Sequence, residues 1–130
     1  MANYPAELKY TKDHEWARPE SGGVRVGITE FAVEQLGDVT LIDLPAVGTQ
    51  LTAAAHFGDI ESVKAVSELF APITGKVVAV NAELADHPEL VNEAPYEKGW
   101  MLLIAPDDPN ALDALMDVAS YRSLLESLDV

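Results

Sequence analysis

One lysine stands apart from the other side chains of this sequence that could do chemistry. Lys64 follows Glu61-Ser62-Val63 and is the only lysine or arginine between residues 26 and 75. Its primary amine ends a four-carbon stem, and acylation would turn that stem into a long neutral arm. Apolar, strand-forming residues on both sides predict a hairpin that exposes the lysine at its tip to a modifying enzyme. The local pattern is equally consistent with an ordinary solvated lysine among carboxylates.

Other catalytic chemistry has little support in the sequence. The chain contains no cysteine, which excludes disulfides, thiolate metal ligands and cysteine nucleophiles. His14, His56 and His87 are far apart and lack paired ligand spacing, so we expect no metal site. No glycine-rich phosphate loop or nucleophile elbow is present. We therefore expect no catalytic residue, and a protein that is not an enzyme on its own.

The charge balance limits the classes of partner. There are 22 acidic and 8 basic residues, for a formal net charge of −14, which opposes contact with nucleic acid or an anionic membrane. Protein partners with basic faces fit this charge, although the acidity can equally serve solubility. The sequence shows no apolar run long enough to span a membrane, and its opening residues resemble neither a secretory signal nor a transit peptide. We therefore expect a cytoplasmic protein.

Short apolar runs separated by glycine and proline predict a mainly β fold in a single domain over residues 1–130. The predicted hairpin around Lys64 spans about 56–70. The strands are expected at 14–18, 24–28, 39–44, 56–63, 65–70, 76–80 and 100–105. Trp16 and Trp100 are expected as core anchors rather than as stacking surfaces.

Three segments break the strand pattern. Thr29 can cap a short helix that ends at Gly37, and a second helical turn is expected at 88–91. After Pro106-Asp107-Asp108-Pro109, apolar residues recur at helical spacing, which predicts a C-terminal helical segment over about 110–128. Its single apolar stripe favours packing on the β body, and a role facing a partner stays open.

The segment Gly58-Asp59-Ile60-Glu61-Ser62-Val63-Lys64-Ala65 resembles the lipoylation site of glycine cleavage H proteins, in which the lysine of a Glu-Ser-Val-Lys motif is modified. Lys64 occupies the matching position. Biotinyl carriers would instead be expected to flank the lysine with methionines. Further segments match the same family in the same order: Tyr10-Thr11-Lys12-Asp13-His14-Glu15-Trp16, Gly27-Ile28-Thr29, Leu36-Gly37-Asp38, Pro72-Ile73-Thr74-Gly75, Pro88-Glu89-Leu90-Val91-Asn92, Pro95-Tyr96 and Gly99-Trp100-Met101.

The resemblance implies a flattened barrel-sandwich hybrid of the lipoyl/biotinyl-carrier type, with short helical inserts and a C-terminal helical segment. It also implies a lipoate covalently bound to Lys64 and a shuttling role. A pyridoxal-phosphate glycine decarboxylase would load the arm with an aminomethyl group. A tetrahydrofolate-dependent aminomethyltransferase would unload it, and dihydrolipoyl dehydrogenase would reoxidise it. Lipoate ligase, or octanoyltransferase with lipoyl synthase, would attach the group.

The resemblance assigns roles to residues around the lysine. Glu61, Ser62 and Val63 match the segment that lipoylating enzymes recognise, while a simple hairpin role is the alternative for the first two. Glu15 and Glu68 are the expected acceptors for the cationic aminomethyl group in a cleft that shelters the loaded arm; Glu68 stands where the family commonly has aspartate. Two alternative functions are a lipoyl domain of a 2-oxo acid dehydrogenase, and a module that relays lipoate or regulates other lipoyl-dependent complexes.

Overall fold

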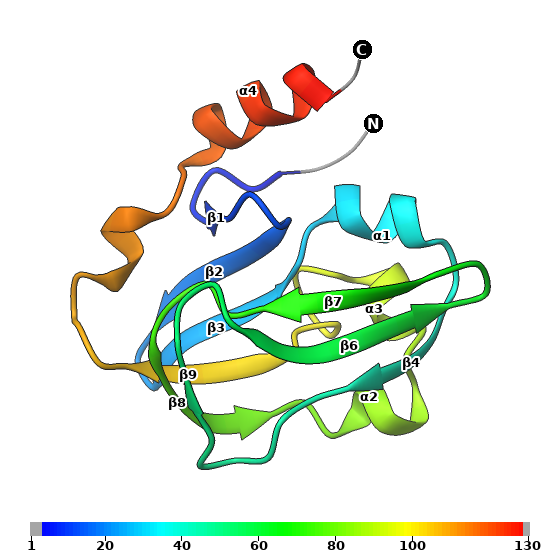
Figure 1. Cartoon of the computed structure of the whole chain (residues 1–130), viewed down its shortest axis with the longest axis horizontal. Helices are drawn as coiled ribbons and strands as arrows, with labels where there is room; N and C mark the ends of the chain where they lie inside the picture. The colour runs from blue at the N-terminus through cyan, green and yellow to red at the C-terminus, as the bar shows by residue number, and fades with distance from the viewer. Residues whose placement is uncertain (1–3, 129–130) are drawn as a thin grey trace.

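Two antiparallel β-sheets form the body of the chain in the computed structural model, which describes residues 4–128 (Figure 1). The larger sheet has the order β1-β2-β3-β9-β8-β5, and the smaller one has the order β4-β6-β7. The strands are β1 (Lys9–Tyr10), β2 (Glu15–Glu20), β3 (Gly23–Ile28), β4 (Val39–Asp43), β5 (Gln50–Leu51), β6 (His56–Ser62), β7 (Val66–Phe70), β8 (Gly75–Val80) and β9 (Leu102–Pro106).

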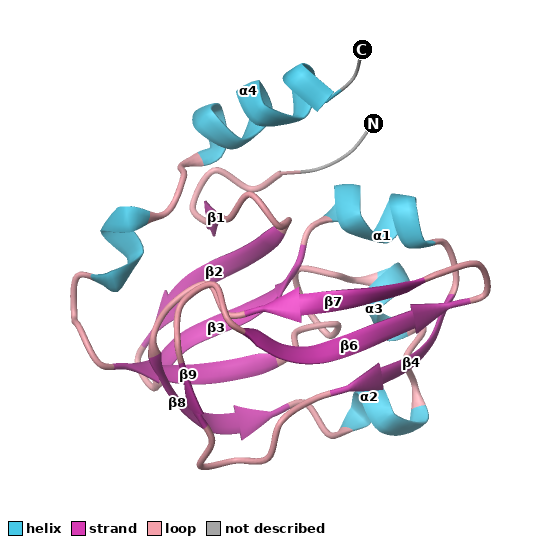
Figure 2. Cartoon of the chain, viewed as in Figure 1, coloured by secondary structure: helices cyan, strands magenta, loops and turns pink. Residues whose placement is uncertain are grey.

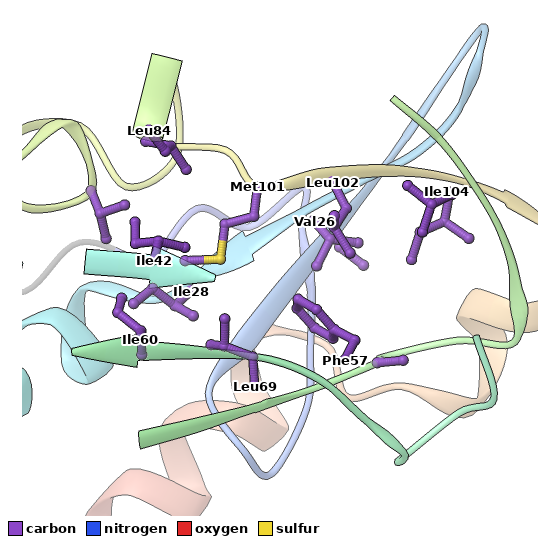
Figure 3. Packing of buried hydrophobic residues seen from close by; sticks show 14 of the residues in the cluster. Val26, Ile28, Ile42, Phe57, Ile60, Leu69, Leu84, Met101, Leu102 and Ile104 are labelled. Atoms are coloured by element: carbon purple, nitrogen blue, oxygen red, sulfur yellow. The ribbon is translucent and has the colours of Figure 1, made fainter. Parts of the chain in front are cut away.

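An aliphatic core fills the space between the sheets (Figure 3). Val26 and Ile28 on β3 face Ile60 and Leu69 from the smaller sheet, and Met101 packs beside them. Alternate residues of a strand point to opposite faces, so the period-two pattern of these strands places their apolar side chains together. Each fully buried aliphatic side chain contributes about 1.5–3 kcal/mol. This core holds the two sheets face to face.

The hairpin made by β6 and β7 carries the predicted attachment site at its end (Figure 1). Asp59 pairs with Glu68, and Glu61 pairs with Val66, across the two strands. Directly paired residues share one face of a sheet, so these four side chains lie on the face opposite the buried Ile60 and Leu69. β7 is an edge of its sheet, which leaves its outer backbone groups free to bind other parts of the chain.

Short helices connect the strands (Figure 2). Thr29 caps α1 (Glu30–Leu36) by accepting a hydrogen bond from the Ala32 backbone N–H, and Gly37 ends the helix at φ 78°. Both helix signals predicted from the sequence are thus confirmed. The remaining helical elements are α2 (Glu83–Asp86), α3 (Leu90–Glu93), the 3₁₀ turn η1 (Ala111–Ala114) and α4 (Val118–Leu128).

The C-terminal segment is helical as predicted, but it is divided into η1 and α4. Met116 lies between them and exchanges two backbone hydrogen bonds with Tyr10, of 2.8 and 2.9 Å. That bridge requires extended backbone, which interrupts the helix. No helix in the described part of the chain combines the length and apolar character that a membrane crossing requires.

A second, largely aromatic cluster joins α4 to the strands β1 and β2 of the larger sheet. The rings of Tyr10 and Tyr121 stack with centroids 4.6 Å apart, and Tyr4 meets Tyr121 edge-on. Trp16 is fully buried in this cluster, as predicted. Trp100, also expected as a core anchor, is only half-buried. The guanidinium of Arg25 lies over its ring, 4.4 Å from the centroid. The cluster anchors α4 to the β body.

Candidate functional site

Lys64 lies at the exposed tip of the β6–β7 hairpin, as the sequence predicts. The turn is held by Ser62, whose backbone N–H donates to the carbonyl of Ala65 at 2.8 Å. The Ser62 hydroxyl accepts from the backbone N–H groups of Ala65 at 3.1 Å and Lys64 at 3.3 Å. Four consecutive residues therefore present the lysine amine to solvent on a defined turn.

The loop after α1 supports this tip. The backbone N–H of Val63 donates to the carbonyl of Asp38 at 3.0 Å. Asn92 from α3 holds the same loop from behind, because its side-chain amide donates to the Gly37 carbonyl at 2.8 Å and accepts from the Val39 N–H at 2.9 Å. A β-carbon at Gly37 would lie 3.6 Å from Cε of Lys64. The lysine stem thus runs beside the C-terminal end of α1.

A cleft of about 290 Å³ begins at the residue after Lys64. It runs between α1 and the outer edge of β7, with the start of β2 at its floor. Eight of the residues that line it are apolar and six are polar or charged. The residues that line it are Asp13, His14, Glu15, Ile28, Phe31, Ala32, Gln35, Leu36, Ile60, Ala65, Val66, Ser67, Glu68 and Leu69.

Glu15 is a buried carboxyl group in this cleft, with only 1% of the residue exposed. Its Oε1 accepts from the hydroxyl of Thr11 at 2.7 Å, and its Oε2 accepts from the edge N–H of Phe70 at 3.2 Å. Burial raises the pKa of Glu15 to about 8, against the smaller opposing effect of these hydrogen bonds. At neutral pH this raised pKa favours the neutral acid form, and a cation beside Glu15 would favour the carboxylate.

Glu68 also lines the cleft, but its carboxylate has other neighbours. One oxygen of Glu68, one of Asp59 and a ring nitrogen of His56 lie within 4.8 Å of one another. His56 Nε2 is 2.9 Å from Asp59, and this contact raises the pKa of His56. An exposed imidazole beside carboxylates is common without a metal, so the absence of a metal site stays a prediction. Glu68 therefore belongs both to the rim of the cleft and to the outer group formed with His56 and Asp59.

The predicted recognition residues take different positions around the tip. Val63 is 71% exposed, and Val66, just past the lysine, is 67% exposed, so apolar surface flanks Lys64 on both sides. The Ser62 hydroxyl forms hydrogen bonds within the turn, which agrees with the simple hairpin role given as the alternative. Glu61 is half-buried on the outer face, where it pairs with Leu41 and Val66. Their role in recognition by lipoylating enzymes stays a prediction.

The sequence analysis assigned only Glu15 and Glu68 to the cleft; the residues it missed include His14, Phe31, Gln35 and Ser67. Phe31 and Gln35 stand four residues apart on α1 and so share one helix face. That spacing could have signalled a common surface, but not what it faces. Ser67 pairs with the buried Ile60 and therefore points to the cleft side of β7. His14 carried no metal-ligand pattern, and its place depends on contacts with distant residues.

The sequence of this site and its fold agree with one known family. The family model described as "Glycine cleavage H-protein" matches residues 8–128. The chain belongs to the glycine cleavage H-protein family. It is 55% identical over 122 residues to the glycine cleavage system H protein of Anaeromyxobacter sp. (strain K), covering 94% of this chain and 95% of that protein. The H protein of Geobacillus kaustophilus (strain HTA426) is 51% identical over 123 residues, covering 95% and 97%.

A solved structure confirms the fold class. The crystal structure of a glycine cleavage system H protein from Mycobacterium marinum superposes with a TM-score of 0.86 at 37% identity, over 95% of this chain and 99% of that one. The predicted architecture of two β-sheets with a C-terminal helix is therefore that of the family, and in this chain the sheets do not close into a barrel.

Proposed function

We propose that this protein is the lipoyl-bearing carrier of a glycine cleavage system, with the lipoyl group on Lys64. The observation that carries the proposal is the joint placement of two groups. The family's Glu-Ser-Val-Lys motif ends at an exposed turn, and a cleft with a buried carboxyl group opens at the next residue. An attachment point and a shelter for the attached arm therefore adjoin.

The side chains around Lys64 fit a lipoyl group. The amine is exposed, so an attaching enzyme can reach it. By extended-chain dimensions a lipoyl-lysine arm spans on the order of 14 Å, enough to lie along the cleft or to enter a neighbouring protein. Ile28, Phe31, Leu36 and Leu69 offer apolar surface to its alkyl chain and ring. When bound, lipoate supplies the disulfide and dithiol chemistry of the cycle.

The protein's own residues hold and shelter the cargo. Lys64 Nζ forms the amide that tethers the arm, and the Ser62 turn fixes where that arm begins. Glu15 accepts hydrogen bonds from the cationic amino group of the cargo, and its proton leaves to solvent as the cation docks. Phe31 and Leu36 on one wall and Leu69 on the other exclude water. Glu68 at the rim adds negative charge at the cleft entrance.

The partners follow from this role. They are the pyridoxal-phosphate decarboxylase that loads the arm, the tetrahydrofolate-dependent aminomethyltransferase that unloads it and dihydrolipoyl dehydrogenase, together with a lipoate ligase or the octanoyltransferase and lipoyl synthase pair. The net charge of −14 favours basic docking faces on these proteins. The carrier performs no chemistry of its own, and the family match gives the lipoate-relay alternative no separate support.

Glycine-dependent exchange of bicarbonate by a glycine decarboxylase tests the proposal. Lipoylated wild-type protein is expected to support exchange at a rate that saturates with carrier concentration. Lys64→Arg keeps the charge but offers no amine for acylation, so it should support none. Lys76→Arg, a lysine on β8 outside the cleft, is the matched control and should behave as wild type. Lack of exchange with fully lipoylated wild type, while another H protein is active, would overturn the proposal.

A further inference from the structure

A chain of three side-chain groups, two of them buried and the third partly buried, connects α4 to the cleft. The hydroxyl of Tyr121 on α4 lies 2.7 Å from Oγ1 of Thr29 and 2.9 Å from Nδ1 of His14. Thr29 and Tyr121 are both fully buried, and His14 lines the arm cleft beside Glu15. The C-terminal helix thus touches the cleft through one hydroxyl group that bonds both the cap of α1 and the histidine.

Counting protons gives the direction of these bonds. Each hydroxyl has one proton to donate, and Thr29 Oγ1 already accepts from the Ala32 N–H at 3.4 Å. If Tyr121 donated to Thr29, the buried Thr29 proton would have no acceptor among the hydrogen bonds of the described residues. Thr29 therefore donates to Tyr121, and Tyr121 donates to His14 Nδ1. An imidazole whose Nδ1 accepts carries its single proton on Nε2 and is neutral.

The backbone of His14 is held in an unusual conformation. Its φ is 69°, in the left-handed region that a non-glycine residue occupies at a cost of about 1–3 kcal/mol. Two hydrogen bonds hold it there: the His14 N–H donates to the Thr11 carbonyl at 3.1 Å, and the Thr29 N–H donates to the His14 carbonyl at 2.9 Å. The ring also packs against Phe31, with centroids 4.6 Å apart. The position and the protonation state of the imidazole are both determined by its surroundings.

The charged residues that line the cleft together with His14 are acidic. Asp13 precedes it, Glu15 follows it, and Glu68 lines the same cleft from β7, while α1 presents the uncharged ring of Phe31 and α4 the phenol of Tyr121. A protonated His14 would be the cation nearest in sequence to the Glu15 carboxylate. In a cleft shielded from water it would pair with that carboxylate and compete with a cationic ligand.

We propose that Tyr121 is a positioning residue for the arm cleft: the Thr29–Tyr121–His14 chain holds His14 as a neutral imidazole and so reserves Glu15 for the cationic cargo. The effect on cargo binding rests on the proposed carrier function, whereas the neutral state of His14 does not. Burial lowers the pKa of His14, against the opposing effect of Asp13, which agrees with a neutral ring. The C-terminal helix therefore contributes to the site without lining the cleft.

The first experiment measures the tautomer of His14 directly. Long-range ¹H–¹⁵N correlation spectra of the unlipoylated, full-length protein are recorded from pH 5 to 8. We expect protonated Nε2 and unprotonated Nδ1 at neutral pH, with titration below the ordinary histidine range. A protonated Nδ1 in the wild-type protein would overturn the proposal. The result does not depend on Lys64 modification, so failure of the carrier function leaves it unaffected.

The second experiment removes the hydroxyl group while keeping the ring. In Tyr121→Phe, the titration midpoint of His14 should move to higher pH. The aminomethyl-loaded carrier should then lose its cargo about fivefold faster near pH 6, the effect of one ordinary hydrogen bond. Tyr10→Phe is the matched control, because its hydroxyl donates to the Pro5 carbonyl at 2.6 Å in the same aromatic cluster. It should leave both readouts unchanged.

Three results of these variants would overturn the proposal: an unchanged His14 titration in Tyr121→Phe, an unchanged release rate despite a shifted titration, or equal shifts in Tyr10→Phe. Circular dichroism checks that each variant is folded. If Tyr121→Phe does not fold, Thr29→Ser replaces it, since a serine hydroxyl can cap α1 and donate to Tyr121. That variant should retain the wild-type tautomer, and loss of the tautomer in a folded Thr29→Ser protein would count against the chain of donors.

Discussion

The hairpin tip and the cleft floor differ in how they present their functional group. At the tip, Lys64 is exposed, and the bonds that hold its turn join Ser62 to Lys64 and Ala65, at most three residues away. At the floor, Glu15 is 1% exposed and bonds to Thr11 and to Phe70, which is 55 residues away in sequence. The lysine amine is open to solvent, whereas burial raises the pKa of the Glu15 carboxyl group.

This difference matches the two tasks of a carrier. Attachment requires access for another protein, so a short local turn on a hairpin is sufficient. Shelter requires exclusion of water, which only several packed elements can provide. Changes at the floor should therefore alter pH dependence and cargo retention, and changes at the tip should alter modification and the local stability of the turn.

The largest expected effect is on stability at high pH. Glu15 has a pKa raised to about 8 in the folded protein and an ordinary value near 4.5 when unfolded, so its contribution is fully present below pH 4.5 and is lost as pH rises to 8. At about 1.4 kcal/mol per pKa unit, we expect a loss of about 4–5 kcal/mol across this range. Glu15→Gln should remove that loss, as measured by urea unfolding at several pH values.

The exposed Glu97 provides the control for this measurement. Glu97→Gln removes one negative charge without removing a buried acid, so its stability should fall with pH as in the wild-type protein. Parallel curves for wild type and Glu15→Gln would contradict the raised pKa of Glu15.

The next effect is on retention of the cargo. Glu15→Ala should speed hydrolysis of the aminomethyl-loaded carrier by roughly tenfold to a hundredfold at pH 7, because a charge-assisted hydrogen bond is lost. The rate is measured as formaldehyde or ammonia release from carrier loaded before the assay. Glu61→Gln alters a carboxylate on the same hairpin that does not line the cleft, and its rate should stay at the wild-type value. Equal rates for Glu15→Ala and wild type would remove Glu15 from the cleft role.

The smallest effects are expected at the tip. Ser62→Ala removes the acceptor for the Lys64 and Ala65 N–H groups and should lower stability by about 0.5–1.5 kcal/mol. It should also slow lipoylation severalfold, while Ser62→Asp, which keeps an acceptor oxygen, should restore the turn. Glu61→Ala tests recognition separately, because Glu61 makes none of these turn bonds. An unchanged lipoylation rate in Glu61→Ala would rule out its recognition role.

The tip was predictable from the sequence because its determinants are local. The strand pattern around Lys64, the cap at Thr29 and the stop at Gly37 each involve neighbouring residues, and the structure contains all three. The two-residue strands β1 and β5 and the four-residue α2 were not predicted, because such short elements have no detectable periodicity. The break before α4 was missed because it depends on a bridge from Met116 to Tyr10.

The cleft was less predictable, because its determinants are contacts between residues that are distant in sequence. The family resemblance named Glu15, but its burial depends on β7, and its pKa depends on that burial. His14 appeared only as an unpaired histidine. Its connection to α4 joins residues 107 positions apart, a contact that no spacing rule in one sequence reveals. Asn92, which supports the hairpin from α3, is likewise a tertiary contact.

Intact-mass analysis with peptide mapping tests the central claim most directly. Protein is prepared from cells supplied with lipoate and expressing a lipoate-attaching enzyme, and the peptide that contains Lys64 is sequenced by fragmentation. The account predicts one lipoyl-sized mass increment, located on Lys64 and absent from Lys64→Arg. An increment on another lysine, or a fully unmodified protein alongside a lipoylated H protein from the same cells, would contradict it.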